Sequence, residues 1–105
     1  MTEISVADLA RRHDAGEDFV LLDVREPDEI ATASIPWALT IPMGEIPDRI
    51  GELPGDKPIA VLCHSGGRSG RVTAYLNQNG LTNAVNVAGG IDAWSTSIDP
   101  AVPRY

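Results

Sequence analysis

The sequence predicts an α/β fold: a small, open, mostly parallel β-sheet of four to five strands with helices on both of its faces. Two observations lead to this fold class. Segments with helical spacing alternate along the chain with short apolar runs. Each run consists of consecutive apolar residues and does not alternate between apolar and polar residues. Such runs are typical of strands buried on both faces of a parallel sheet. A length of 105 residues fits one core, so we expect a single domain over residues 1–105.

The first half of the chain begins with a predicted helix and a predicted strand. Ser5 is a candidate N-cap for a helix whose apolar positions share one face, and Gly16 is placed to end it. Residues 19–24 form an apolar run that predicts a buried strand. Three shorter elements are expected next: a helix over 27–31, a strand over 38–41, and a helix of one to two turns around Ile46 and Ile50 that ends at Gly51.

The second half continues the alternation. Residues 58–62 predict a second fully buried strand, and residues 69–79 carry a helical pattern that stops at Gly80. A strand is expected over 84–87. Gly89-Gly90 predicts a tight backbone turn, followed by a short helix through Trp94, which we expect in the core. The tail, with Pro100 and Pro103, is expected to pack back over the surface.

The composition limits the possible partners and compartments. The formal net charge is -7, with one lysine and no basic run, which argues against binding to nucleic acid or to an anionic membrane. No apolar stretch approaches the roughly 18 residues of a membrane span, and the N-terminal residues do not resemble a signal peptide. One cysteine excludes an internal disulfide, so these features together favour a reducing cytoplasm.

Residues 63–69 read Cys-His-Ser-Gly-Gly-Arg-Ser and contain the only cysteine. They join a predicted buried strand to a predicted helix, and ligands of such sheets bind at the carboxyl ends of the strands. Loop N–H groups, the helix dipole and Arg68 all favour a thiolate, so we expect a lowered pKa for Cys63. Gly66 and Gly67 permit a close backbone approach, and Ser69 is a candidate helix N-cap. The loop therefore predicts a nucleophile beside an anion-binding site.

Further polar residues lie near this cysteine in sequence or at a neighbouring strand end. His64 and Ser65 complete the loop, and His64 is badly placed to form a cysteine–histidine dyad. Arg71, about one turn into the helix, is expected to add long-range attraction. Asp23 and Arg25 lie at the end of the other central strand, where they either orient the loop or form a structural ion pair.

Other kinds of cysteine site are disfavoured. A cysteine that only fills the core needs no polar, glycine-rich loop around it. No second cysteine could resolve an oxidised Cys63, which argues against a dithiol redox enzyme. The sequence has no Cys-x-x-Cys pair and no Cys/His cluster, so we expect no metal and no cofactor. His13 is expected on an exposed or half-buried helix face.

Three segments together resemble the rhodanese family of sulfurtransferases, and the resemblance covers nearly the whole chain. Residues 63–69 match the family's Cys-x-x-Gly-x-Arg-Ser loop, residues 22–29 its Asp-Val-Arg-Glu segment, and residues 87–94 its Gly-Gly-x-x-Ala-Trp signature. One segment departs from the pattern. Residues 33–38 read Ala-Ser-Ile-Pro-Trp-Ala where the family usually has Gly-His-Ile-Pro-Gly-Ala, and Trp37 could add an apolar patch near the site.

The resemblance implies a sulfurtransferase with ping-pong kinetics and no cofactor. Cys63 would take sulfane sulfur from a small anionic donor such as thiosulfate, and pass it as a persulfide to cyanide, a cellular thiol or a protein acceptor. Arg68 would help to hold the oxyanion of the donor. Two alternatives stay open: a non-catalytic module that carries or senses sulfur for a partner protein, and a cysteine-dependent phosphatase or arsenate reductase. The second is disfavoured because related phosphatases have a loop one residue longer.

Overall fold

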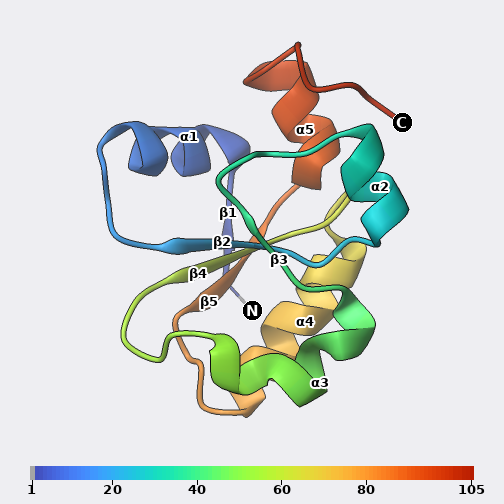
Figure 1. Ribbon diagram of the computed structural model, residues 1–105. Helices are drawn as coiled ribbons and strands as arrows, with labels where there is room; N and C mark the ends of the chain where they lie inside the picture. The colour runs from blue at the N-terminus through green and yellow to red at the C-terminus, as the bar shows by residue number, and fades with distance from the viewer. Residues whose placement is uncertain (1) are drawn as a thin grey trace.

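A computed structural model describes residues 2–105 and contains one parallel sheet of five strands. The strand order is β1-β5-β4-β2-β3, and every neighbouring pair is parallel (Figure 1). The predicted fold class is confirmed. The strands are β1 (Glu3–Ile4), β2 (Val20–Asp23), β3 (Leu39–Thr40), β4 (Ile59–Leu62) and β5 (Ala84–Val87). The sequence did not predict β1, because two residues are too few to show a period; this strand exists through its pairing with β5.

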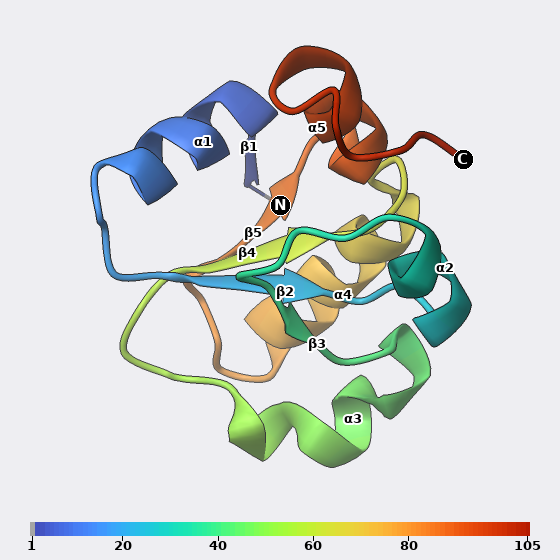
Figure 2. The same ribbon diagram turned by 45° about the horizontal axis from the view of Figure 1, so that its top comes forward.

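Helices cover both faces of the sheet, as Figure 2 shows. Helices α1 and α5 lie on one face, α3 and α4 on the other, and α2 lies beyond the end of β2 (Figures 1 and 2). The helices are α1 (Val6–Asp14), α2 (Pro27–Thr32), α3 (Ile46–Arg49, flanked by 3-10 turns over Met43–Glu45 and Ile50–Glu52), α4 (Gly67–Gln78) and α5 (Gly90–Ser97). None of the helices within residues 2–105 has both the length and the apolar character that a membrane crossing requires.

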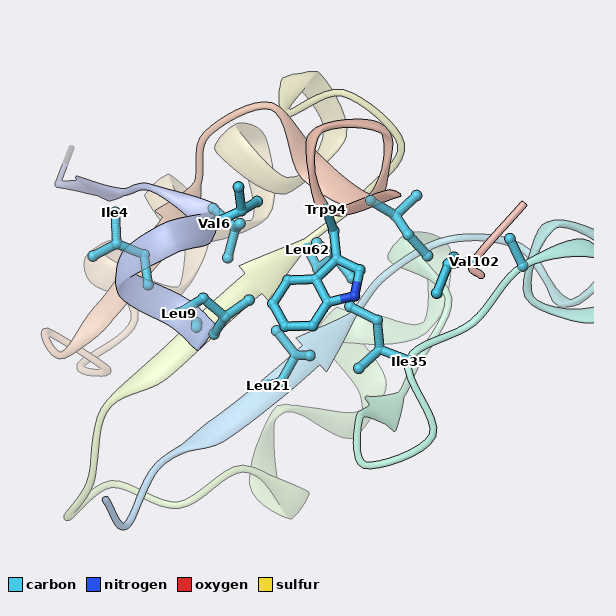
Figure 3. Packing of buried hydrophobic residues seen from close by; sticks show 12 residues of the cluster. Ile4, Val6, Leu9, Leu21, Ile35, Leu62, Trp94 and Val102 are labelled. Atoms are coloured by element: carbon cyan, nitrogen blue, oxygen red, sulfur yellow. The ribbon is translucent and has the colours of Figure 1, made fainter. Parts of the chain in front are cut away.

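Each face of the sheet has its own hydrophobic core. Adjacent residues of a strand point to opposite faces, so Leu21 of β2 joins one core and Leu22 joins the other. The core under α1 and α5 contains Trp94, which is buried as predicted and lies near Leu21 and Leu62 in Figure 3. The core under α3 and α4 contains Cys63.

The N-caps of helices α1 and α4 can be compared with the two N-caps that the sequence predicts. The hydroxyl of Ser5 accepts a hydrogen bond from the backbone N–H of Asp8 at 3.0 Å, which confirms the predicted N-cap of α1. The start of α4 differs from the prediction: the N-cap is Gly66, with φ of +112°, and the helix begins at Gly67. Ser69 is therefore wrong as an N-cap. It lies in the first turn of α4, fully buried, and its side chain points to the cysteine instead.

Candidate active site

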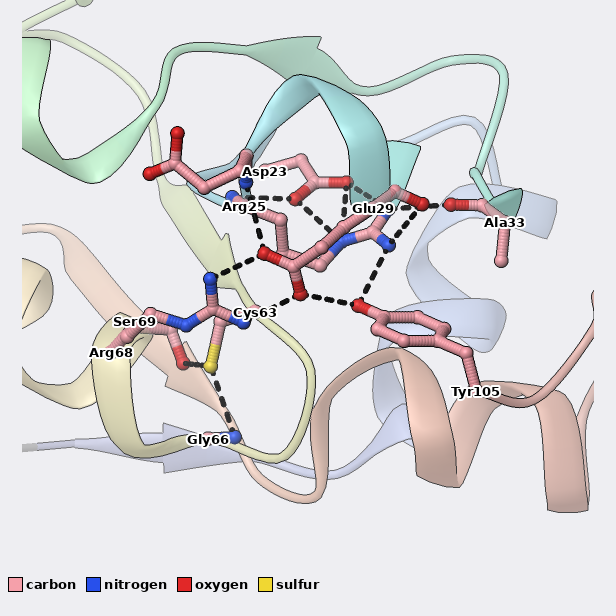
Figure 4. A network of polar contacts seen from close by, with 10 residues as sticks. Asp23, Arg25, Glu29, Ala33, Cys63, Gly66, Arg68, Ser69 and Tyr105 are labelled. Atoms are coloured by element: carbon pink, nitrogen blue, oxygen red, sulfur yellow. Dashed lines mark hydrogen bonds and ion pairs between the residues drawn. The ribbon is translucent and has the colours of Figure 1, made fainter. Parts of the chain in front are cut away.

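Cys63 lies directly after β4, almost fully buried, and its sulfur faces the turn that follows (Figure 4). The backbone N–H of Gly66 donates to Sγ at 3.1 Å, and Oγ of Ser69 lies 3.2 Å from Sγ. Burial alone would raise the pKa of the Cys63 thiol. Hydrogen bonds from the Ser69 hydroxyl and from backbone N–H groups of the loop outweigh burial, so the pKa lies below that of an ordinary thiol, as expected.

The loop is held in this shape by the start of α5. The N–H of Ile91 donates to the carbonyl oxygen of Cys63 at 2.9 Å, and the N–H of Asp92 donates to that of His64 at 3.0 Å. In a trans peptide the N–H points opposite to the C=O. Binding the His64 carbonyl therefore turns the N–H of Ser65 towards the sulfur, where it contributes to lowering the pKa of Cys63.

Gly90 is essential to this contact, which extends the predicted role of a tight backbone turn. Gly89 and Gly90 have φ of +80° and +58°. A β-carbon at Gly90 would overlap the carbonyl oxygens of Cys63 and His64. Only glycine lets the two backbones approach this closely.

Asn86 of β5 fixes the other side of the loop. Its Nδ2 donates to the Gly66 carbonyl at 3.3 Å and to Oε2 of Glu3 at 2.9 Å. This orientation directs Oδ1 of Asn86 to the hydroxyl of Ser69, which lies between Asn86 and the sulfur. The hydroxyl has one proton and two acceptors within reach, so it can donate to a thiolate when one forms.

Arg68 makes a two-point ion pair with Glu29 of α2. Its Nη1 lies 2.6 Å from Oε1 and its Nη2 lies 2.8 Å from Oε2. The pair holds the pKa of Glu29 at about 2, through the hydrogen bonds from Arg68 first, with Glu26 N–H and Tyr105 contributing and burial opposing. The guanidinium predicted to face an anionic donor is therefore bound to a carboxylate of the protein itself.

The Asp23–Arg25 ion pair is buried, and Arg25 also donates hydrogen bonds to backbone carbonyls of α2 and of the residue that follows it. Nη2 of Arg25 lies 2.7 Å from Oδ2 of Asp23 and donates to the Ala33 carbonyl at 2.8 Å, while Nη1 donates to the Glu29 carbonyl at 3.3 Å. Among the described residues, the side chains of this ion pair make no hydrogen bond to the loop over 63–69. Of the two interpretations, this geometry favours the structural ion pair.

Tyr105 contacts both Arg25 and Glu29, as Figure 4 shows. Its hydroxyl accepts a hydrogen bond from Nη1 of Arg25 at 3.1 Å and donates to Oε2 of Glu29 at 2.8 Å. Its ring stacks on His64, with 4.3 Å between ring centroids. The expected tail packing thus includes a specific contact at the site.

The side chains of the other candidate residues make no hydrogen bond to the sulfur among residues 2–105. Ser65 in the loop and Gly67 at the start of α4 are exposed. Arg71 is exposed, makes no ion pair among residues 2–105, and lines a pocket of about 200 Å³ between α3 and α4. No three potential metal ligands lie close together in residues 2–105.

Trp37 does not extend the site. Its ring stacks on His13, with 3.8 Å between centroids, and meets Phe19 and Trp94 edge-on. Trp37, which could have added an apolar patch near the cysteine, instead packs against the core under α1 and α5. His13 is exposed, within the predicted range.

Three site residues were missed in the sequence: Glu29, Asn86 and Tyr105. Asn86 had a usable signal, because a lone amide within an apolar strand needs a partner when buried. Glu29 was noted only as part of a matching segment. Tyr105 carries no local signal, since its partners lie 76 and 80 residues earlier in the chain.

Comparisons with known proteins agree with this geometry. Residues 5–97 match the family model described as a rhodanese-like domain. A sulfurtransferase of Allochromatium vinosum is 43% identical over 95 residues, covering 90% of this chain and 89% of that protein. A putative sulfur carrier protein of Bacillus subtilis is 36% identical over 93 residues, covering 89% of this chain and 50% of that protein.

A solved structure shows the same architecture. The crystal structure of a protein from Staphylococcus saprophyticus has a TM-score of 0.86 and 39% identity, covering 93% of this chain and 97% of that one. The family model spans strands β2 to β5, the cysteine loop and α5. The chain belongs to the rhodanese-like domain family.

Proposed function

We propose that this protein is a sulfurtransferase in which Cys63 carries sulfane sulfur as a persulfide. The observation that carries the proposal is the position of Sγ, which receives the Gly66 N–H and lies next to the Ser69 hydroxyl. These groups stabilise negative charge on sulfur, and no basic side chain of residues 2–105 makes a hydrogen bond to it. The relative named a sulfurtransferase supports the same reaction class.

The first half-reaction loads the cysteine. The Cys63 thiolate attacks the sulfane sulfur of the donor, the S–S bond of the donor breaks, and its electron pair leaves with the donor's remaining part. With thiosulfate as donor, the products are the Cys63 persulfide anion and sulfite. The lowered pKa of Cys63 supplies the thiolate for this step.

The second half-reaction unloads the cysteine onto an external acceptor. A thiolate or cyanide attacks the terminal sulfur of the persulfide and takes it, which restores the Cys63 thiolate. Because Cys63 is the only cysteine, no second thiol of the chain can accept the sulfur. We therefore expect ping-pong kinetics and a reducing compartment such as the cytoplasm, where acceptor thiols remain available.

The other predicted site residues take supporting roles in this proposal. Residues 64–69 form the turn around the sulfur, and the Asp23–Arg25 pair fixes the start and end of α2. Arg71 contributes attraction to anions from the rim, because it has no carboxylate partner among the described residues.

Intact-mass spectrometry tests the proposal directly. After incubation with thiosulfate or with an alkyl persulfide, the protein should gain one sulfur atom that a thiol or cyanide then removes. Cys63→Ser should gain none. A wild-type protein that gains no sulfur from either donor would show that the proposal is wrong.

A second candidate is a sulfur carrier module that passes the persulfide sulfur only to a partner protein. The relative named a putative sulfur carrier protein is the observation that favours it. Loading without turnover on small acceptors separates this role from the first. Hydrolysis of an aryl phosphate that depends on Cys63 would instead support the phosphatase alternative.

A further inference from the structure

Glu29 occupies the one arginine that the cysteine loop itself supplies. Both terminal nitrogens of Arg68 contact Glu29, at 2.6 and 2.8 Å. Arg68 and Glu29 are both largely shielded, with side chains 30% and 16% exposed. A two-point contact of this kind between a guanidinium and a carboxylate is the strongest geometry the two groups can adopt.

The carboxylate of Glu29 is also held from two other directions. The Tyr105 hydroxyl donates to Oε2 at 2.8 Å, and the backbone N–H of Glu26 donates to Oε1 at 3.1 Å. With Arg68 this makes four donors, which fills the roughly four acceptor positions of a carboxylate. Glu29 is therefore held in place by α2 and by the tail, and an incoming anion must compete with it for both terminal nitrogens of Arg68.

A donor that reaches Arg68 meets an ion pair without net charge. Two other nearby cations are paired as well, Arg25 with Asp23 and Arg104 with Asp92. Arg71, on the face of α4 that lines the pocket next to α3, makes no ion pair among the described residues. The reaction with thiosulfate brings a dianion to the Cys63 thiolate and releases a sulfite dianion. An unpaired cation in the loop would stabilise both states, and the ion pair with Glu29 neutralises the one arginine of the loop, Arg68.

We propose that Glu29 is a specificity-determining residue that disfavours dianionic sulfur donors and leaves the site to donors of low charge, such as an alkyl persulfide. This inference rests on the proposed sulfur transfer. With an alkyl persulfide, the Cys63 thiolate attacks the terminal sulfur of R–S–SH and the S–S bond of the donor breaks. Cys63–S–SH forms and R–S⁻ leaves, so the reaction needs no dianion site.

The test compares two donors in matched variants. Glu29→Gln keeps the size of the side chain and removes its charge, which frees Arg68. Asp28→Asn is the control, because Asp28 is the exposed neighbour in α2 and its carboxylate makes no ion pair among the described residues. Tyr105→Phe removes only one of the four hydrogen bonds to Glu29.

The measured quantity is the rate constant for loading Cys63, followed by intact mass, with thiosulfate and with the persulfide of 2-mercaptoethanol. In Glu29→Gln the thiosulfate-to-persulfide ratio should rise about tenfold, the value of one charge-assisted hydrogen bond. Tyr105→Phe should move the ratio in the same direction by less, and Asp28→Asn should not move it. If Glu29→Gln fails to fold, the direction of the Tyr105→Phe change decides.

A binding measurement separates this inference from the proposed function. In a Cys63→Ser background, Glu29→Gln should bind thiosulfate about tenfold more tightly by calorimetry. If both donors load Cys63 and the ratio does not change in Glu29→Gln, the inference is wrong and the sulfur transfer stands. If neither donor loads Cys63, the proposed function is wrong, and the calorimetric comparison alone decides whether Glu29 excludes dianions.

Discussion

The carboxyl ends of β2 and β4 lie side by side, and they stabilise negative charge in different ways. After β4, the sulfur of Cys63 meets backbone N–H groups and one hydroxyl. After β2, the carboxylate of Asp23 meets the guanidinium of Arg25, and Glu29 meets Arg68. Negative charge is therefore stabilised by dipoles after β4 and by ion pairs after β2.

This difference assigns different tasks to the two regions. A complete ion pair has almost no net charge, so it stabilises new charge on a reacting atom only weakly. It does hold together the two elements that it joins. Dipoles held by the fold stabilise charge as it forms, without reorganising. We therefore expect substitutions after β2 to affect mainly stability, and substitutions around the loop to affect mainly the reactivity of Cys63.

The largest expected effect tests the ion-pair region. Arg25→Met leaves the Asp23 carboxylate buried without its partner, which should lower the free energy of unfolding by about 3–5 kcal/mol. Arg49→Met is the control, because Arg49 pairs with Glu45 and Glu52 on the surface and should cost less than about 1 kcal/mol. Denaturant unfolding measures both. Equal losses would contradict the assignment of the buried pair to stability.

The second prediction tests the contact between α5 and the loop. Gly90→Ala adds a β-carbon that overlaps the carbonyls of Cys63 and His64, in addition to the strain of a positive φ. We expect a loss of about 3 kcal/mol and slower alkylation of Cys63. Gly16→Ala is the matched control: its φ is +71° with open space around it, so it should cost only about 1 kcal/mol. Similar losses in the two variants would show that the close approach is unimportant.

The smallest predicted effect separates dipoles from formal charge at the sulfur. Ser69→Ala removes a hydrogen bond that favours the thiolate, so the pKa of Cys63 should rise towards that of an ordinary thiol. A higher pKa lowers the thiolate fraction at pH 7, and iodoacetamide alkylation should slow about tenfold with its inflection at higher pH. Arg68→Gln should slow alkylation less, because Glu29 already neutralises Arg68.

The control for this third prediction is Ser95→Ala. Ser95 is another buried serine, but its hydroxyl donates to the Ile91 carbonyl and makes no contact with the sulfur. Its loss should leave the alkylation profile unchanged. If Arg68→Gln slows alkylation as much as Ser69→Ala does, formal charge and not the dipoles controls the thiolate.

The sequence was sufficient for the elements with a strong local pattern. The apolar runs at β2 and β4 fixed the sheet type, and the glycine-bearing loop after β4 located the cysteine. The helix begins two residues before the predicted start, at Gly67, and its N-cap is Gly66 in place of Ser69. A helix that begins there turns Ser69 inward, and single-sequence patterns do not resolve helix starts this finely.

The partners of the loop could not be predicted because they come from distant parts of the chain. Asn86 lies 20 residues from Gly66, and Glu29 lies 39 residues from Arg68. Pairing of this kind depends on how β5 and α2 are placed in three dimensions. A single sequence contains the residues of such a pair but no periodic signal that joins them.

The hydrogen bonds from Ile91 and Asp92 to the loop also have a consequence for synthesis and folding. The groups that aim the Ser65 N–H at the sulfur come from a helix that is translated more than twenty residues after Cys63. A nascent or unfolded chain therefore carries an ordinary thiol at this position. The contribution of the Ser65 N–H to the lowered pKa of Cys63 appears only when the C-terminal helix docks. The pH at which alkylation of Cys63 has its inflection therefore reports docking of this helix.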